Sequence, residues 1–541
     1  MRVGSFVVIG VAGLTIFGCS GDNKNGGGFS DRPSASGSVG VFRYAIPTIP
    51  TTLDPAKVQD GDTIDIIQQE FEGLVKWGED NRVQPNLADK WDISPDGTTY
   101  TFHLKKGVKF TNGRAVTADD FKWCMERACN PNYSSVTAKT YMADIVGVNE
   151  RLNDKVGKVK EVTGIKVIDP ATLEIKIDKA RPYFLDKMTY ACSYVYAKEA
   201  LPDPMKDMAK IEQMVGTGPF KMDKFAPDSI VILVANKDYH GGAPMLSRIE
   251  RPFIKDSQSR LNKYKAGELD LITLELQDLK AVKDDAKLNG DLQYFERPSL
   301  YYLGMNCDTV PALKDRRVRQ AIGMALDRDY LIKEVLGGIN RKADAILPPS
   351  VKCFREKTNG LKFDVEKAKA LLAEAGFPGG KGFPELEFNY RDGRPDVENV
   401  AQAIQQQLKQ NLGINLKTQK IEWGAYLQKH NSKKMQIFHM RWAADYLDPE
   451  NFLSTLLASY GNENKINYKN DEYDALCKEG DMTMDEEKRK VIYAKAEDIV
   501  LQDAPFIPIY YQKDAELISK RVSGIRNSAF GHLPHTTTAV K

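Results

Sequence analysis

Strand-like and helix-like patterns alternate along this chain, and that alternation restricts its possible folds more than any other feature. Residues 99–104 (TYTFHL) alternate apolar and polar side chains, as a half-buried strand does. Thr117 and Asp120 then carry the capping-box signature of a helix start. In the second half, the strand-like runs 414–418 and 435–441 lie on either side of a helical stretch. This order predicts an α/β protein whose second half is built on βαβ units.

Three other segments give clear local predictions. A helical stripe with a period of 3.6 residues consists of Val397, Val400, Ala401, Ile404, Leu408 and Leu412. Gly413 should end that helix, because glycine readily adopts the conformation found just after a helix. The continuous apolar run 230–234 is typical of a central strand. Residues 165–177 predict two strands that turn at Asp169–Pro170.

The N-terminal residues predict export. Arg2 precedes an apolar run, residues 6–17, which is too short to span a bilayer and has the proportions of a secretory signal. The run ends in residues 16–19 (IFGC), which resemble a bacterial lipobox whose cysteine is lipidated. Residues 20–40 are rich in Gly, Ser, Asn and Asp, the composition of a flexible tether.

We therefore expect a signal peptide at residues 1–18 and, at residues 19–40, a lipidated Cys19 followed by the tether. The alternative is an ordinary cleaved signal in which Cys19 is not modified. With lipidation, the protein is anchored at a membrane surface of the cell envelope and faces the periplasm or the cell exterior.

Length and charge narrow the possible partners. A chain of 541 residues is several times the usual length of one domain, so two or three lobes are expected. The formal net charge is only +2 and no block of like charge stands out, which argues against a nucleic-acid partner. No apolar stretch after the signal approaches membrane-spanning length.

Catalytic and metal-binding signatures are missing from the sequence. It has no glycine-rich phosphate loop, GxSxG elbow, HExxH motif or EF-hand pattern. The cysteines form no CxxC pair and no zinc-like spacing, so we expect no metal site and no cofactor. A large exported body without such signatures favours binding over turnover, so we expect no catalytic residues and no enzyme.

A series of short motifs extends from the start of the mature chain to its last quarter. They are TLDP at 52–55, FEGL at 71–74, PNLADKW at 85–91, SPDG at 94–97, KFTNGRAVTADDF at 109–121, GTGPF at 216–220, DRRVRQA at 315–321, ALDR at 325–328, KALLAEAG at 369–376 and WAADY at 442–446. As an ordered set they resemble family 5 of the bacterial extracellular solute-binding proteins, in particular its peptide-binding lipoproteins of ABC transporters.

The resemblance implies a periplasmic-binding-protein-like α/β fold (class II, cluster C). It has two main lobes joined by a hinge, plus an extra domain. We expect lobe I at 41–85, 211–300 and 516–541, the extra domain at 86–210, and lobe II at 301–515. The implied function is to capture oligopeptides by hinge closure and to deliver them to the permease subunits of an ABC importer. We expect a monomer.

The resemblance also implies a ligand site. Asp445, in the motif at 442–446, matches the aspartate that pairs with the α-ammonium of a peptide. Without the resemblance, Asp445 is better explained as the cap of the turn that leads into Asp448–Pro449. Trp423, Trp442 and Tyr302 match aromatic pocket-lining positions, and their alternative role is core packing.

The residues that would bind the carboxylate end of the ligand are less well defined by the resemblance. Relatives use basic residues there, usually arginine, at positions that hold His430 and His439 in this chain. A neutral histidine is a weaker carboxylate anchor than arginine. Arg441, Arg391 and Arg394 lie nearby in sequence and are further candidates.

Other functions remain open at this point. Proteins of the same fold bind metal chelates, sugars, haem or antibiotics, so the ligand could be a solute other than a peptide. A secreted hydrolase is a second alternative, against which stands the missing nucleophile and base. A third is a surface adhesin or a signalling lipoprotein that reports its ligand to a partner.

Overall fold

The computed structural model describes residues 40–133, 135–227 and 229–541. The predicted signal peptide, Cys19 and all but the last residue of the predicted tether lie outside the described residues. In the described part, no helix is both long enough and apolar enough to cross a membrane.

The first strand of the described chain belongs to a four-stranded sheet. Its strands, in spatial order, are β1 (Val41–Arg43), β10 (Arg248–Pro252), β9 (Ile230–Ala235) and β8 (Phe220–Ala226). β9 has a neighbour on each side, so the apolar run 230–234 is an interior strand, as predicted. Helix α1 (Gly61–Glu70) packs against β8.

A second four-stranded sheet lies between residues 88 and 176. Its spatial order is β4 (Ala88–Ile93), β5 (Thr99–Leu104), β7 (Thr172–Lys176) and β6 (Ile165–Asp169). Tyr100, Phe102 and Leu104 are buried and alternate with half-buried residues, which confirms the predicted strand. Helix α2 (Ala118–Ala128) packs on β6 and begins where the Asp120 carboxylate accepts a hydrogen bond from the Thr117 backbone N–H.

The third sheet has seven strands and carries the parallel units. In spatial order these are β11 (Leu271–Thr273), β17 (Phe506–Ile518), β12 (Leu292–Met305), β16 (Ile437–Ala443), β14 (Leu386–Arg391) and β15 (Leu416–Ile421), and β13 (Arg341–Lys342) pairs with β17. β14 is parallel to both β15 and β16. Helices α13 (Pro395–Leu412) and α14 (Trp423–Asn431) connect these three strands, which confirms the βαβ prediction.

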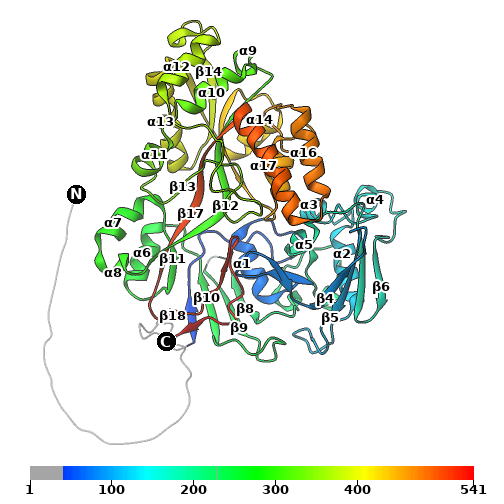
Figure 1. Ribbon diagram of the computed structural model, residues 1–541. Helices are drawn as coiled ribbons and strands as arrows, with labels where there is room; N and C mark the ends of the chain where they lie inside the picture. The colour runs from blue at the N-terminus through cyan, green and yellow to red at the C-terminus, as the bar shows by residue number, and fades with distance from the viewer. Residues whose placement is uncertain (1–39, 134, 228) are drawn as a thin grey trace, which may run out of the picture. The chain divides into compact units, whose positions relative to one another are not determined.

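Strands β12 and β17 are the longest in the sheet and lie side by side (Figure 1). They pair as far as Glu296, opposite Lys513, and again from Leu300, opposite Tyr511. Between these pairs β12 contributes three residues and β17 only Gln512, an interruption that we call the register break. The neighbours of the two strands differ before and after this break. The part of β17 that follows the break also pairs with β11, and the part of β12 that follows it also pairs with β16.

Opposite faces of the third sheet bury different hydrophobic clusters. Tyr301 and Leu303 belong to a cluster that includes the apolar stripe of α13. Their strand neighbour Tyr302 belongs to a second cluster, with Phe438 and Tyr426 of α14. The α13 stripe is buried as predicted, and Gly413 ends the helix in the left-handed region at φ 69°.

Shorter elements connect and cover these sheets. Those of the first half are β2 (Val75–Trp77), β3 (Val83–Pro85), α3 (Val136–Tyr141), α4 (Val148–Asn153), α5 (Phe184–Lys187), α6 (Ser257–Lys265), α7 (Leu279–Asp284) and α8 (Ala286–Asn289). Those of the second half are α9 (Pro311–Lys314), α10 (Arg316–Met324), α11 (Arg328–Tyr330), α12 (Val365–Glu374), α15 (Leu453–Leu457), α16 (Asp471–Met482), α17 (Glu486–Asp503), β18 (Val522–Ser523), β19 (Asn527–Ser528), β20 (Gly531–His532) and β21 (Ala539–Val540).

Candidate ligand-binding site

Most of the predicted site residues lie at one edge of the third sheet. The parallel strands β14, β15 and β16 have their carboxyl ends at this edge, so the segments that follow them are neighbours. Arg391 ends β14, Trp423 follows β15, and Asp445 follows β16. Ligands of open α/β sheets bind outside the carboxyl ends of the strands, which makes this edge the candidate site.

An asparagine organises the segment around Asp445. Asn451 Oδ1 accepts hydrogen bonds from the indole N–H of Trp442 at 3.1 Å and from the Asp445 backbone N–H at 3.0 Å. Its Nδ2 lies 3.5 Å from Asp445 Oδ2. From the first half of the chain, the Tyr141 hydroxyl donates to Asp445 Oδ1 at 3.3 Å. We call Asp445, Trp442, Asn451 and Tyr141 the acidic corner.

The Asp445 carboxylate contacts neutral donors instead of a cation. No lysine, arginine or histidine of the described residues forms an ion pair with it, and burial raises its pKa above the ordinary aspartate value. Lys187 lowers that pKa to a smaller degree, but its Nζ is paired with Asp144 at 2.7 Å. A half-buried carboxylate of this kind is suited to an added cation.

The turn after β16 has a different capping residue. Asp448 Oδ1 accepts a hydrogen bond from the Glu450 backbone N–H at 3.1 Å, and the buried Asp448 carboxylate also pairs with Arg489 at 2.7 Å. The Asp445 carboxylate accepts no backbone hydrogen bond among the described residues. The turn therefore does not need the Asp445 side chain as its cap.

Three arginines gather at the same edge. The Arg391 guanidinium lies 4.4 Å from the centre of the Trp423 ring. Arg394 pairs with Asp396 at 2.7 Å, whereas Arg391 and Arg441 form no ion pair with any described residue. Burial, and then the charges of Arg394 and Arg441, lower the pKa of Arg391. We call Arg391, Arg394 and Arg441 the basic corner.

Comparison with known proteins establishes the family. The sequence pattern of bacterial extracellular solute-binding proteins, family 5 (middle region), matches residues 82–464. The protein belongs to family 5 of the bacterial extracellular solute-binding proteins.

Individual relatives of this family 5 protein differ in their ligands. The probable deoxycholate-binding periplasmic protein YgiS of Escherichia coli is 32% identical over 492 residues, which cover 90% of each chain. The oligopeptide-binding protein OppA of Bacillus subtilis is 29% identical, over 95% of this chain and 94% of its own. The names of these relatives state different ligands, so the similarity alone does not identify the ligand class of this family 5 protein.

The fold agrees with a solved relative. The ABC transporter-associated periplasmic binding protein DppA of Helicobacter pylori, in complex with the peptide STSA, has a TM-score of 0.73 and 25% identity. The match covers 93% of this chain and 98% of that chain. The predicted periplasmic-binding-protein-like α/β fold is thereby confirmed.

The two predicted histidines of this family 5 protein lie on opposite faces of the sheet. His439 on β16 is 2% exposed and stacks on Tyr301, with ring centres 5.7 Å apart. His430 of α14 packs edge-on against Phe438, at 4.8 Å. Phe438 and His439 are successive strand residues, so their side chains point to opposite faces. His430 and His439 therefore cannot hold one carboxylate together.

Both histidines are neutral at pH 7. Burial lowers the pKa of each ring to about 4. His439 has no hydrogen-bond partner on either ring nitrogen among the described residues, and His430 has none on Nε2. Neither ring therefore supplies a positive charge to a ligand carboxylate at neutral pH.

The predicted aromatic residues differ in their exposure. Trp423 and Trp442 are half-buried at the sheet edge and pack against the cluster that contains Tyr302. Tyr302 itself is 4% exposed and lies 4.5 Å, between ring centres, from Phe506. The two tryptophans thus have surface available for a ligand, and a pocket role for Tyr302 stays a prediction.

Tyr141, Asn451 and Gln512 belong to the site region but were not among the sequence candidates. Tyr141 stacks on Tyr190 with ring centres 3.7 Å apart, and Gln512 accepts a hydrogen bond from Arg441 Nη1 at 3.1 Å. Asn451 lies six residues after Asp445, within reach of a local turn, and this spacing is the one sequence signal that could have identified it.

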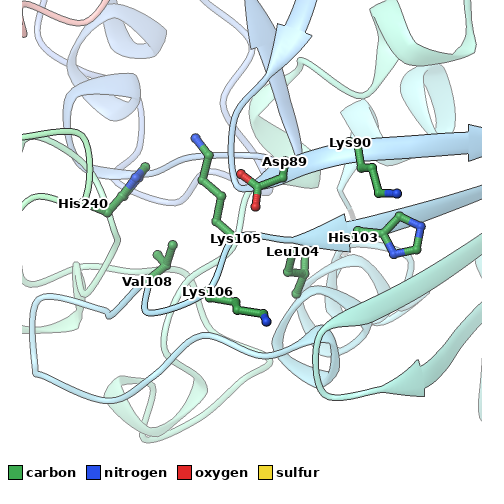
Figure 2. A pocket seen from close by; sticks show the side chains of 8 residues that line it. All are labelled: Asp89, Lys90, His103, Leu104, Lys105, Lys106, Val108 and His240. Carbon is green, nitrogen blue, oxygen red and sulfur yellow. The ribbon is translucent and has the colours of Figure 1, made fainter.

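The structure also has a separate cavity of about 530 Å³, and Figure 2 shows the side chains that line it. It is lined by Asp89, Lys90, His103, Leu104, Lys105, Lys106, Val108 and His240. None of the predicted site residues lines it. Among the described residues, no group of three or more His, Cys, Asp or Glu side chains is placed to hold a metal ion.

Proposed function

We propose that this protein is the peptide receptor of an ABC importer. The observation that carries the proposal is the separation of charge at one sheet edge, with an unpaired carboxylate at the acidic corner and unpaired guanidinium groups at the basic corner. A peptide is a zwitterion with its charges at its two ends, so it complements both corners at once. Recognition through the ends and the backbone requires no fixed peptide sequence.

Each group has a role in this proposal. Asp445 pairs with the α-ammonium, and Arg391 and Arg441 receive the α-carboxylate. Trp423 and Trp442 offer apolar area to ligand side chains, where water fills the remaining space. Charge-assisted hydrogen bonds of this kind strengthen when the site closes and water leaves.

Contacts between the first and second halves of the chain support closure over the acidic corner. Besides the hydrogen bond from Tyr141 to Asp445, Tyr183 stacks on Tyr446 with ring centres 5.4 Å apart. Lys352 forms an ion pair with Asp186 at 2.8 Å. These contacts connect the proposed extra domain, 86–210, to the proposed lobe II, and ligand binding between them favours the closed form.

The remaining parts of the proposal concern the location and the partners. The protein is held at a membrane surface through a lipidated Cys19 and passes its cargo to the permease as a monomer. We place lobe I at 41–85, 211–300 and 516–541 and lobe II at 301–515, with the hinge at the register break. The similarity to peptide-binding ABC transporter proteins supports this assignment.

A second candidate ligand is a non-peptide anion, such as the bile acid named for the YgiS relative. The unpaired Arg391 and Arg441 favour it, because a single carboxylate needs only the basic corner. Asp445 argues against it, because burying a second anion near an unpaired carboxylate is unfavourable.

Native mass spectrometry of the purified protein tests the proposal, followed by titration calorimetry with tri- to pentapeptides and with deoxycholate. We expect intact peptides in the native spectrum and tighter binding of peptides than of deoxycholate. Deoxycholate as the tighter ligand would overturn the peptide assignment in favour of the second candidate. Cleavage of the added peptides would instead support the hydrolase.

A further inference from the structure

A chain of side-chain hydrogen bonds connects the basic corner to the register break. Arg441 Nη1 donates to Gln512 Oε1 at 3.1 Å, and Gln512 Nε2 donates to Asp514 Oδ1 at 2.8 Å. Arg297 Nε then donates to Asp514 Oδ2 at 2.5 Å. We call Arg441, Gln512, Asp514 and Arg297 the relay.

The relay crosses the sheet at its most interrupted point. Gln512 is the single β17 residue opposite the three β12 residues that have no partner in β17, and Arg297 is the first of those three. β12 and β17 have no paired residues there, although Ser299 of β12 still pairs with Ala443 of β16. A change in backbone dihedrals at this point therefore breaks fewer hydrogen bonds between β12 and β17 than elsewhere in the two strands. Hinges are a few residues of this kind that absorb large dihedral changes.

Donor and acceptor roles along the relay require an amide at its centre. Arginine only donates, and an ionised aspartate only accepts. The Gln512 side chain carries one acceptor and two donors, so it accepts from Arg441 and donates to Asp514 in one orientation. A glutamate at this position could still accept from Arg441, but it would place a second carboxylate beside Asp514.

Arg441 keeps donors for a ligand while it is bound to Gln512. A guanidinium has five N–H donors, and the bond to Gln512 uses only Nη1. Arg441 is exposed, so its remaining donors are accessible. The bond to Gln512 restricts a long side chain that would otherwise adopt many conformations, which lowers the entropy cost of binding an anion.

We propose that Gln512 is a positioning residue that orients Arg441 for an anionic ligand group and couples this group to the hinge. This inference rests on the proposed function, because it assigns the ligand carboxylate to Arg441. The position of Arg441 then depends on the backbone at the register break. An anion bound at Arg441 therefore favours the hinge state in which the relay is intact.

The test compares Gln512→Leu, Gln512→Glu and the control Gln405→Leu. Gln405 also has a half-buried amide, which donates to Leu416 O at 2.7 Å between α13 and β15, away from the relay. Calorimetry measures the affinity of each variant for the best-binding peptide and for its C-terminal amide. Gln512→Leu should bind the free peptide about tenfold more weakly and the amide nearly normally, whereas the control should change neither.

A double-variant cycle separates positioning from general damage to the fold. In an Arg441→Ala background, Gln512→Leu should cause no further loss of affinity for the free peptide. Gln512→Glu should also weaken the free peptide selectively, because its carboxylate competes for Arg441. Equal losses for the free peptide and the amide, or additive losses in the cycle, would overturn the inference.

Hydrogen exchange of the ligand-free protein gives a readout that does not depend on the ligand. Gln512→Leu should speed exchange of the amides around the register break, and Gln405→Leu should not. If the wild-type protein binds no peptide, the proposed function is wrong. Hydrogen exchange then still tests whether Gln512 is coupled to the register break. Unchanged exchange at the break in Gln512→Leu would overturn the coupling to the hinge.

Discussion

The acidic and basic corners lie at the same sheet edge but stabilise their charges in different ways. At the acidic corner, a single carboxylate is surrounded by neutral donors, Tyr141 and Asn451, and burial raises its pKa. At the basic corner, three guanidinium groups lie close together, and in the described part of the chain only Arg394 has an acidic partner. Among the described residues, one corner therefore has a carboxylate without a cationic partner, and the other has two arginines without an acidic partner.

This difference bears on the ligand class. A ligand that carries only an anion leaves the acidic corner without a partner, and a ligand that carries only a cation leaves the basic corner without one. A zwitterion with separated charges satisfies both. Changing one corner of the site, or one end of the ligand, at a time therefore tests whether each corner recognises one charged end.

The largest expected effect comes from Asp445→Ala. This change leaves a bound α-ammonium without its partner in a closed site, which typically costs about 2–5 kcal/mol. The affinity for peptides should fall roughly thirtyfold to several thousandfold by calorimetry. The control is Asp392→Ala, which removes an exposed carboxylate at the end of β14 that pairs with Lys420. Similar losses in both variants would contradict a special role for the acidic corner.

A smaller loss is expected at the basic corner, where Arg391→Ala and Arg441→Ala each leave one arginine to receive the carboxylate. A hydrogen bond to a charged group contributes about 1.5–3 kcal/mol, so each change should weaken peptide binding about tenfold to a hundredfold. The loss should disappear for peptides with an amidated carboxyl end. Calorimetry on both forms checks this, and an equal loss for amidated peptides would place the carboxylate elsewhere.

The pH dependence of binding should follow the acidic corner. Asp445 must be ionised to pair with an ammonium, and burial raises its pKa, so it becomes protonated at a higher pH than an exposed aspartate. Peptide affinity should therefore be full at neutral pH and fall as the pH drops toward this raised pKa. Asp445→Asn should lack this dependence. Calorimetry between about pH 4 and 8 measures the peptide affinity of both proteins. If the affinity depends on pH in the same way in both, a group other than Asp445 controls binding.

The smallest effect is expected from the histidines. Because burial lowers the pKa of His439 to about 4, its ring carries no charge that could attract a carboxylate at pH 7. His439→Gln should change peptide affinity by less than about threefold, the scale of a weak neutral interaction. A tenfold loss confined to peptides with a free carboxyl end would assign carboxylate capture to His439 instead of the arginines.

Local patterns allowed much of the fold to be predicted. Residues 99–104 form a strand within those bounds, and α13 ends at Gly413, because alternation and helical periodicity follow from which face is buried. The parallel units of the second half also follow from the order of local patterns along the chain. The fold as a whole was recognised through the ordered motifs of the family.

The long-range contacts were not predictable from local patterns. Tyr141 reaches Asp445 from 304 residues away, and β12 pairs with β17 across more than 200 residues. Nothing in the sequence near Tyr141 or Gln512 indicates these partners. The separation of His430 from His439 depends on the pleat of β16, which is known only once its register with β12 is fixed.

The most direct test of the central claim is calorimetry on the wild-type protein with one peptide in three forms: free, N-acetylated and C-amidated. If the two corners hold the two ends of one ligand, each blocked form should bind at least tenfold more weakly than the free peptide, with the larger loss on acetylation. If both blocked forms bind as tightly as the free peptide, the charges at this sheet edge do not recognise peptide ends, and the account is wrong.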